Sequence, residues 1–180
     1  MYRLRQGQQL KKPFNDHFTA FRHTERMAAY LEIDGLKLRR KVRALVMNHA
    51  GDILLVRPHG YRSDDWALAG GGVEHGESPH QAMRREIAEE LGIALEESIE
   101  TLPVTNRFIY SHDYKAKRAL DHDGQEATMF VVRLPNDTHL TLQAEEIAEA
   151  RWFSREEAAQ AFPVQKQRDI FEACLASLAA

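Results

Sequence analysis

The segment from residue 71 to residue 93 constrains this 180-residue chain more than any other part of the sequence. It follows the frame G-x5-E-x7-R-E-U-x-E-E-x-G-U, where U is a bulky apolar residue and x is any residue. Seven fixed positions, each matched at a usage of roughly 0.07, give a chance match on the order of 10⁻⁸ per starting position. The frame is therefore a strong signal, and its fixed residues are Gly71, Glu77, Arg85, Glu86, Glu89, Glu90 and Gly92.

The second half of this segment carries the signals of one short helix. Ser78 is a good N-cap, and Pro79 fits the first helical position, where a missing N–H costs nothing. Gly92 suits the left-handed conformation in which many helices end. Apolar residues spaced four apart form a stripe that is typical of a buried helix face, and they are Met83, Ile87 and Leu91. We therefore predict a helix between residues 78 and 92.

Three glutamates share one side of the predicted helix. Glu86, Glu89 and Glu90 fall on an arc of about 100° next to the apolar stripe. Like charges four apart destabilise an isolated helix, and a hard divalent cation is a natural partner for such a cluster. Taken alone, the acidic run favours a solvated helix face by roughly ten to one. The preceding glycines, residues 70–72, change this balance because glycine lets the backbone approach a metal or ligand closely.

The complete frame resembles the Nudix box, the signature of hydrolases that act on nucleoside diphosphates linked to another moiety. The resemblance implies an α/β fold, the Nudix-type α/β/α sandwich with a mixed central sheet. It also implies that Glu89 and Glu90 are the principal ligands of Mg²⁺ (or Mn²⁺). Glu86 is implied as a further ligand or as the base that orients the attacking water, and the Gly70 carbonyl as another ligand.

The remaining fixed residues of the box are implied to be structural. Arg85 and Glu77 would hold the loop and the helix together, and Gly71 and Gly92 complete the structural set. Magnesium is favoured over zinc because the cluster offers only oxygen ligands. Metal ions in such a site would neutralise the charge of the diphosphate, activate water and stabilise the leaving phosphate.

The composition of the whole chain is that of a globular protein, with 43% apolar and 28% charged residues. Its length suits one domain with an appended segment. The single cysteine, Cys174, excludes an intramolecular disulfide framework and fits a reducing cytoplasm, and its apolar helix face favours packing over catalysis. We expect a cytoplasmic protein with no membrane span. The net charge of −3 argues mildly against nucleic acid as a partner.

Turn signals and apolar runs outline the other elements. Asp34-Gly35 predicts a hairpin turn, and the apolar runs predict strands at residues 30–33, 42–47, 53–56, 101–110, 127–134 and 150–153. Ser154 and Glu157 form a capping-box pattern, and residues 164–178 read as a final helix. We expect residues 1–37, with a short helix at 15–29 and the hairpin, to be an N-terminal extension that supports a homodimer. Residues 38–180 would then form the Nudix hydrolase domain.

A further carboxylate is expected just before the strand at residues 150–153. Nudix enzymes often supply one from a loop at this place, and Glu146 is our first choice, with Glu145 second and Glu126 a weaker alternative. It would complete the metal site or act as the base. An ordinary solvated loop acid is about equally favoured, because loops collect charged residues.

Aromatic and basic residues outside the box offer a pocket for a nucleotide, which needs rings for its base and cations for its phosphates. The candidate substrate-binding residues are Arg57, Tyr61, Trp66, Phe108 and Tyr110. Each taken alone is more often a core or surface residue, by roughly three to one. The nearby histidines, including His112, receive no catalytic role. The basic run Lys115–Arg118 is predicted to be a solvated flexible loop.

The favoured function is that of a Mg²⁺-dependent pyrophosphohydrolase acting on a small nucleotide. The substrate would resemble ADP-ribose, or be a dinucleoside polyphosphate or a nucleoside triphosphate. An RNA 5′-pyrophosphohydrolase is one alternative. A Nudix module that binds nucleotides without catalysis is the other, and it ranks lower because every glutamate of the box is present.

Overall fold

The computed structural model describes residues 29–95 and 99–179 of the chain. These residues form a six-stranded mixed sheet in the order β4-β5-β2-β3-β6, with β1 paired to β2 beside that path. The strands are β1 Tyr30–Ile33, β2 Leu36–Asn48, β3 Ile53–Pro58, β4 Glu100–Ile109, β5 Gly124–Leu134 and β6 Ile147–Phe153. The helices are α2 Pro79–Leu91, α3 His112–Arg118, α4 Arg155–Ala161 and α5 Gln165–Ser177.

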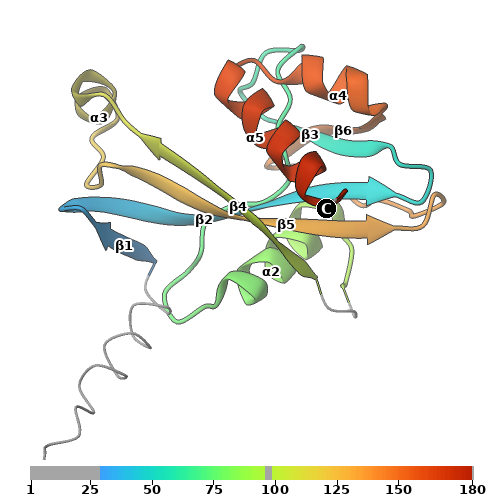
Figure 1. Ribbon diagram of the computed structural model, residues 1–180, viewed down its shortest axis with the longest axis horizontal. Helices are drawn as coiled ribbons and strands as arrows, with labels where there is room; N and C mark the ends of the chain where they lie inside the picture. Colours follow the sequence, from blue (N-terminus) through green and yellow to red (C-terminus); the bar gives the residue numbers. More distant parts are fainter. Residues whose placement is uncertain (1–28, 96–98, 180) are drawn as a thin grey trace, which may run out of the picture.

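Helices cover both faces of the sheet, which confirms the predicted α/β sandwich (Figure 1). Successive residues of β2 point to opposite faces, as the strand period of two requires. Val42, Ala44 and Val46 join the apolar core beneath α2, whereas Leu45 and Met47 join the core beneath α4 and α5. Both faces of β2 are therefore buried along residues 44–47, which explains the continuous apolar run there.

The predicted hairpin is confirmed at the start of the described chain. Asp34 and Gly35 have φ angles of 53° and 75°, as a two-residue hairpin turn with two left-handed positions requires. The turn joins β1 to β2, and the hairpin therefore belongs to the central sheet. The helix predicted at residues 15–29 lies outside the described residues apart from its last position.

The helix of the box is confirmed as α2, which begins at its Ser78 N-cap and ends at Gly92. The Ser78 hydroxyl accepts from the Gln81 N–H, and the Gln81 side chain accepts from the Ser78 N–H. This reciprocal pair is a capping box, which satisfies two backbone donors of the first turn. The apolar stripe is fully buried against the sheet, as Met83, Ile87 and Leu91.

The glycine-containing stretch of residues 67–72 lies between β2 and β3, where these two strands diverge. Isolated antiparallel bridges join Ala67 to Val56, Ala69 to Ala44 and Gly72 to Lys41. Gly70 has a φ of 126°, and a Cβ there would overlap the Val42 carbonyl. Only glycine suits both conditions at residue 70. The bridges hold the stretch against β2, directly above α2.

Two other expectations can be compared with the structure. The final helix is confirmed as α5, and Cys174 on it is fully buried in the core. The prediction of a flexible loop at Lys115–Arg118 was wrong, because these residues belong to α3. The Ser111 hydroxyl caps α3 by accepting from the Tyr114 N–H. In the part of the chain that the structure describes, no helix is long and apolar enough to span a membrane.

Candidate active site

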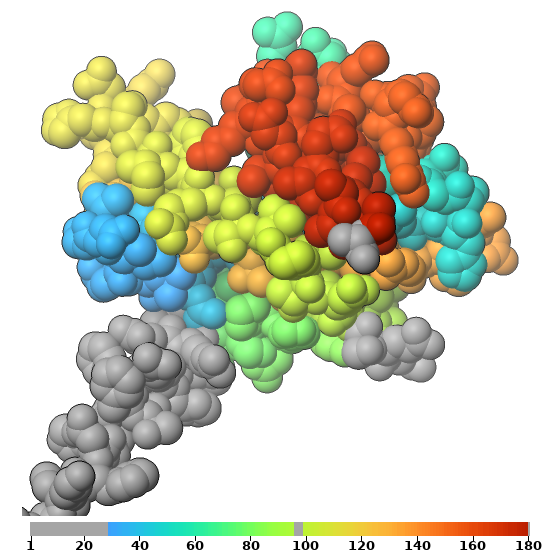
Figure 2. All heavy atoms as spheres, viewed as in Figure 1, coloured from blue at the N-terminus to red at the C-terminus, as the bar shows by residue number. Residues whose placement is uncertain are grey.

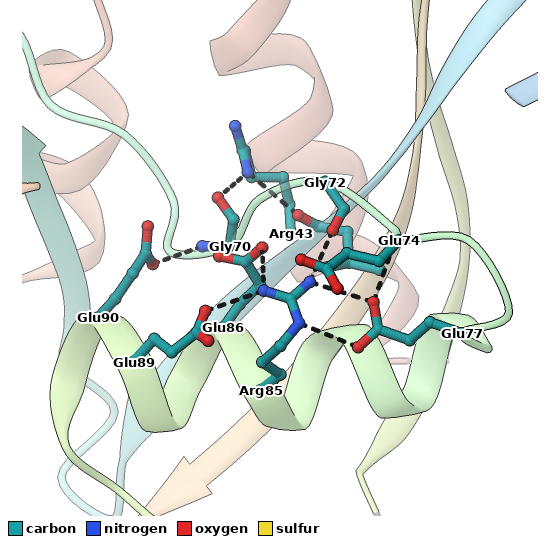
Figure 3. Close-up of polar contacts among 10 residues, drawn as sticks. Arg43, Gly70, Gly72, Glu74, Glu77, Arg85, Glu86, Glu89 and Glu90 are labelled. Carbon is teal, nitrogen blue, oxygen red and sulfur yellow. Dashed lines mark hydrogen bonds and ion pairs between the residues drawn. The ribbon is translucent and has the colours of Figure 1, made fainter. Parts of the chain in front are cut away.

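Two of the three α2 carboxylates, those of Glu86 and Glu89, lie against the guanidinium of Arg85 (Figure 3). Arg85 Nη1 donates to Glu86 Oε1 at 3.0 Å and to Glu89 Oε2 at 2.9 Å. Glu86 is buried, whereas half of the Glu89 side chain is exposed. The repulsion that the sequence predicts among these acids is thus offset in part by Arg85, which lies between two of them.

The same guanidinium joins α2 to the loop before it. Arg85 Nε and Nη2 donate to the two oxygens of Glu77 at 3.0 and 3.1 Å, and Nη2 also donates to the Gly72 carbonyl at 2.8 Å. Burial alone would raise the pKa of Glu77, but hydrogen bonds from Arg85 and from the Glu74 N–H lower it below its ordinary value. A planar guanidinium with five donors is well suited to hold a loop and a helix in one arrangement.

Gly71 lies against the carboxylate of Glu86. A Cβ at residue 71 would overlap all three atoms of that carboxylate group. The Gly71 carbonyl meanwhile accepts from the Val42 N–H at 3.0 Å, which holds the glycine against β2. The missing side chain of Gly71 therefore leaves the space that the Glu86 carboxylate fills.

Glu90 is the most deeply placed acid of the cluster, and only 7% of its surface is exposed. Its Oε2 accepts from the Gly70 N–H at 2.7 Å. Burial raises the pKa of Glu90 to about 7, because a charged carboxylate is costly where water is excluded. Burial likewise raises the pKa of Glu86, although Arg85 opposes that shift. Two buried acids side by side are expensive for the fold, which is typical of a functional site.

Glu146 reaches this cluster on a loop that is tied to the end of α2. The Thr141 N–H donates to Leu91 O at 2.9 Å, and the Gln143 N–H donates to Glu90 O at 3.3 Å. Glu146 is exposed, and its charge contributes to the raised pKa of Glu90. The loop thus places the last candidate ligand beside α2, and it places Glu145 on the same stretch.

The donor set can be tested against a divalent cation. Within residues 29–95 and 99–179, no three acidic, histidine or cysteine side chains are already gathered closely enough to enclose an ion. Arg85 draws Glu86 and Glu89 toward itself, whereas Glu90 turns to the Gly70 amide (Figure 3). The chemistry fits a hard cation nevertheless, because carboxylates meet a glycine loop whose surface a Cβ would fill.

The Gly70 carbonyl has a cationic neighbour from the sheet. The Arg43 guanidinium, on β2, donates to Gly70 O and to Val42 O (Figure 3). Lys41, two residues earlier on β2, lies within electrostatic reach of Glu86 and Glu90. The carboxylate cluster is thus bordered by positive charge on its sheet side.

The candidate substrate-binding residues fall into two groups. Tyr61, Phe108 and Tyr110 line one groove together with Arg43. Arg57 and Trp66 lie elsewhere and contact other residues: Arg57 donates to Glu149 at 2.7 Å, and Trp66 packs edge-on against Phe153. Glu126, the weaker alternative for the extra carboxylate, accepts from Arg107 at 2.6 Å.

Several further residues line the same groove and were not among the predicted substrate-binding residues. They are Lys41, Arg43, Asn106, Tyr114, Gln125 and Lys166. The sequence of β2 did carry a signal for two of them. Arg39, Lys41 and Arg43 occupy every second position, as residues on one face of a strand do. The predicted strand began only at residue 42, and this alternation was therefore not used.

Comparisons with known proteins agree with this arrangement. The chain matches the NUDIX domain family over residues 37–174. An RNA pyrophosphohydrolase of Acidiphilium cryptum is 31% identical over 144 residues, covering 76% of this chain and 87% of the relative. Another, of Saccharophagus degradans, is 32% identical over 124 residues and covers 65% of this chain and 70% of the relative.

Solved structures show the same fold. The E. coli dihydroneopterin triphosphate pyrophosphohydrolase superposes with a TM-score of 0.65 at 19% identity, covering 78% of this chain and 96% of that protein. The E. coli ORF135 protein gives a TM-score of 0.56 at 30% identity, covering 82% and 95%. From the match over most of its length, the chain belongs to the NUDIX domain family and is a pyrophosphohydrolase of that family.

Proposed function

We propose that the α2 carboxylates hold Mg²⁺ or Mn²⁺ and that the chain hydrolyses a diphosphate linkage in a nucleotide there. The observation that carries this proposal is the pair of buried acids, Glu86 and Glu90, beneath the glycine stretch. Nudix hydrolases generally use such divalent ions. We assign the ligands to Glu86, Glu89 and Glu90 and to the Gly70 carbonyl, with Glu146 as the additional carboxylate.

When bound, the metal would neutralise the diphosphate charge, lower the pKa of water and stabilise the leaving phosphate. The chain's own groups supply position. Arg85 fixes the side chains of Glu86 and Glu89, and Gly71 leaves room for the Glu86 carboxylate. Glu86 and Glu146 are the two candidates for the base that accepts a proton from the attacking water. Of these, Glu86 is buried at the site, whereas Glu146 is exposed at its edge.

The substrate class is narrowed by the relatives. Those of Acidiphilium cryptum and Saccharophagus degradans are named RNA pyrophosphohydrolases. Among the solved structures are a dihydroneopterin triphosphate pyrophosphohydrolase and a C. elegans Ap4A hydrolase, the latter at a TM-score of 0.60 and 20% identity. We propose that this chain cleaves a nucleoside polyphosphate. The second candidate substrate is the 5′ end of RNA, and the names of the curated relatives favour this second candidate.

The organisation of the chain is part of the same proposal. Residues 38–180 would be the catalytic domain, and residues 1–37 an extension that supports a homodimer. The β1–β2 hairpin at the border pairs into the central sheet, which gives such an extension a firm anchor. We place the protein in the cytoplasm, in keeping with its single buried cysteine.

A hydrolysis panel tests the proposed function. Purified protein with Mg²⁺ or Mn²⁺ is assayed on ATP, GTP, diadenosine tetraphosphate, ADP-ribose and 5′-triphosphorylated RNA, and the products are separated by chromatography. We expect metal-dependent cleavage of at least one polyphosphate, and loss of cleavage in excess EDTA. No hydrolysis of any member with either metal would reject the proposal. Tight nucleotide binding without turnover would instead favour a non-catalytic module.

The double variant Glu89→Gln/Glu90→Gln connects the activity to this cluster. We expect kcat/KM to fall at least about 1,000-fold, or about 4 kcal/mol of transition-state stabilisation, because two metal ligands lose their charge. Glu172→Gln, an exposed acid on α5, is the matched control and should retain wild-type activity. Unchanged cleavage by the double variant would place the chemistry elsewhere.

A further inference from the structure

A groove lies on the sheet face opposite α2, between α3 and the first turn of α5. Its volume is about 380 Å³, and its wall comes from β2, β4, β5 and the segments that follow them. In Figure 2 the yellow atoms around α3 and the red atoms of α5 rise on either side of a hollow. Asn106, Phe108 and Tyr110 alternate along β4 and its end, and all three line this groove.

Exposed apolar side chains gather at this groove. Five large apolar residues are exposed in the described part of the chain, and four of them line it: Tyr61, Phe108, Tyr114 and Val164, which are 41–49% exposed. The fifth, Ile109, lies on the opposite face of β4. Apolar side chains concentrated in one hollow, with few others elsewhere, are typical of a binding site.

The aromatic part of the wall is ordered by ring contacts. The Tyr110 ring lies 5.6 Å from Phe108 and 5.0 Å from Tyr114, between ring centroids. The Tyr110 hydroxyl donates to Gln125 at 3.2 Å, and its ring also meets the edge of His122 at 5.7 Å. Rings that are already held in place lose little entropy when a flat ligand stacks on them.

The groove also carries cations and no acid. Lys41, Arg43 and Lys166 line it, and none of the described lining residues is acidic. No carboxylate lies within ion-pair distance of Lys41 in the described chain, although the residue is partly buried. Burial, together with the positive charges of the nearby Arg43 and Arg39, lowers the pKa of Lys41 to about 8. A bound anion would relieve both effects.

The two kinds of residue lie in a definite order. Arg43 donates to Gly70 O, and Lys41 is within electrostatic reach of Glu86 and Glu90, so the cationic end adjoins the carboxylate cluster. The aromatic end lies toward α3, whose Tyr114 completes the row of rings. A ligand that spans the groove therefore needs negative charge at one end and a flat aromatic group at the other.

We propose that this groove binds a nucleoside 5′-polyphosphate, either free or at the 5′ end of an RNA, with its phosphates at Lys41 and Arg43 and its base on Phe108 and Tyr110. The proposal deepens the function given above and rests on it for the place of the cleaved linkage. Asn106 and Gln125 also line the groove, and their amides can donate to and accept from the edge of a base. A sugar rich in hydroxyl groups fits less well, because no carboxylate lines the groove to accept hydrogen bonds from those hydroxyls.

The test separates the base from the phosphates. Binding of an ATP analogue that carries methylene groups in place of both the α,β and the β,γ bridging oxygens, and of inorganic tripolyphosphate, is measured by calorimetry with Mg²⁺ present. We expect the analogue to bind wild-type protein more tightly than tripolyphosphate does. Phe108→Ala should weaken the analogue about tenfold through lost stacking and leave tripolyphosphate unchanged. Lys41→Met should weaken both ligands by a similar factor.

The matched control is Ile109→Ala, which removes an equally exposed apolar side chain from the same strand but from its other face. It should change neither affinity. Equal affinities of wild type for the two ligands, or an unchanged affinity of Phe108→Ala for the analogue, would overturn the proposal. Circular dichroism of Phe108→Ala and Lys41→Met confirms that any loss of binding occurs in folded protein.

A second arm identifies the source of the nucleotide. A 5′-triphosphorylated RNA of ten nucleotides is compared with the free analogue over a range of salt concentrations. Tighter RNA binding with a steep salt slope, reduced by Lys117→Ala/Arg118→Ala on α3, indicates an RNA end. Equal affinity and a matching slope indicate a free nucleotide. If Phe108→Ala changes neither the affinity for RNA nor the affinity for the analogue, both sources of the nucleotide are rejected.

Failure of this proposal and failure of the proposed function give different results. The binding measurements use a ligand that is not hydrolysed, and they do not depend on turnover. Binding that follows the expected pattern in a protein without hydrolysis would reject the function and retain the groove. Hydrolysis that survives with no effect of Phe108→Ala on nucleotide affinity would retain the function and reject the groove.

Discussion

The two faces of the central sheet carry functional groups in different ways. On the α2 face, the glycines and three of the carboxylates come from one continuous segment, residues 70–90, and each of these three carboxylates already has a hydrogen-bond partner. On the opposite face, the groove draws on residues as far apart in the sequence as Lys41 and Lys166. The carboxylate site comes from one segment and is held by hydrogen bonds, whereas the groove forms only when distant segments of the chain come together.

This difference teaches what each site is suited to do. Hydrogen bonds from Arg85 and the close approach of Gly71 restrict the carboxylates, which favours a fixed reaction geometry. The groove is lined by residues of several elements, and we expect these residues to decide which substrate binds. Changes on the α2 face should reduce turnover of every substrate, whereas changes in the groove should alter the ranking of substrates.

Gly71→Ala offers the largest test of this comparison. The added methyl group overlaps the Glu86 carboxylate, and we expect kcat/KM to fall about 100-fold, or about 2.7 kcal/mol, for all substrates alike. Gly72→Ala is the adjacent control, since its Cβ meets chiefly the guanidinium of Arg39, the end of a flexible side chain. Steady-state kinetics on two substrates measures both. A loss confined to one substrate would break the division between the faces.

Arg85→Ala tests whether the α2 face is restrained as strongly as its contacts indicate. Removing a guanidinium with contacts to Glu77, Glu86, Glu89 and Gly72 should lower the free energy of unfolding by about 2–3 kcal/mol. Arg62→Ala removes an exposed arginine and should cost less than about 0.5 kcal/mol. Urea unfolding followed by tryptophan fluorescence gives both values. Equal effects would show that Arg85 contributes no more than a surface residue.

Glu90→Gln tests the cost of the buried acid in metal-free protein. The pKa of Glu90 is raised to about 7, so its ionisation favours the unfolded chain, with no effect below its ordinary pKa and the full effect above about 7. In EDTA at pH 8 we expect Glu90→Gln to be more stable than wild type by about 1–3 kcal/mol. The glutamine oxygen can still accept from the Gly70 N–H.

Glu89→Gln is the control for this measurement, because half of the Glu89 side chain is exposed and it pairs with Arg85. It should bring no gain in stability. Thermal unfolding of the three proteins in EDTA compares them directly. A Glu90→Gln variant that is less stable than wild type would mean that the charge of Glu90 is stabilised in the free protein.

The part of the fold that was predictable from sequence is the part with local signals. Ser78 and Gly92 bound α2 by caps that act within one turn, and Asp34-Gly35 sets the hairpin. Helix α3 was missed because none of its residues is buried, so it shows no apolar period. It depends instead on the Ser111 cap and on contacts such as the ion pair of Lys115 with Asp123, which sequence spacing does not reveal.

The groove was less predictable because its residues meet only through the order of the strands. Phe108 on β4 and Lys41 on β2 come together because β5 lies between these strands, parallel to β2 and antiparallel to β4. No local pattern encodes that order. Trp66 shows the converse. Its residue type suggested that it stacks on a ligand, yet only 5% of its surface is exposed and its ring packs against Phe153.

The stretch of residues 67–72 is hydrogen-bonded to a strand on each side. The N–H groups of Val42 and Ala44 on β2, and of Val56 on β3, donate to its carbonyls. The Gly70 amide and carbonyl therefore cannot open to solvent as an independent loop would. Hydrogen exchange of the Gly70 N–H should be as slow as that of the sheet interior, since exposure of this amide requires the flanking strands to separate. In this enzyme the integrity of the reaction centre is inseparable from that of the whole domain.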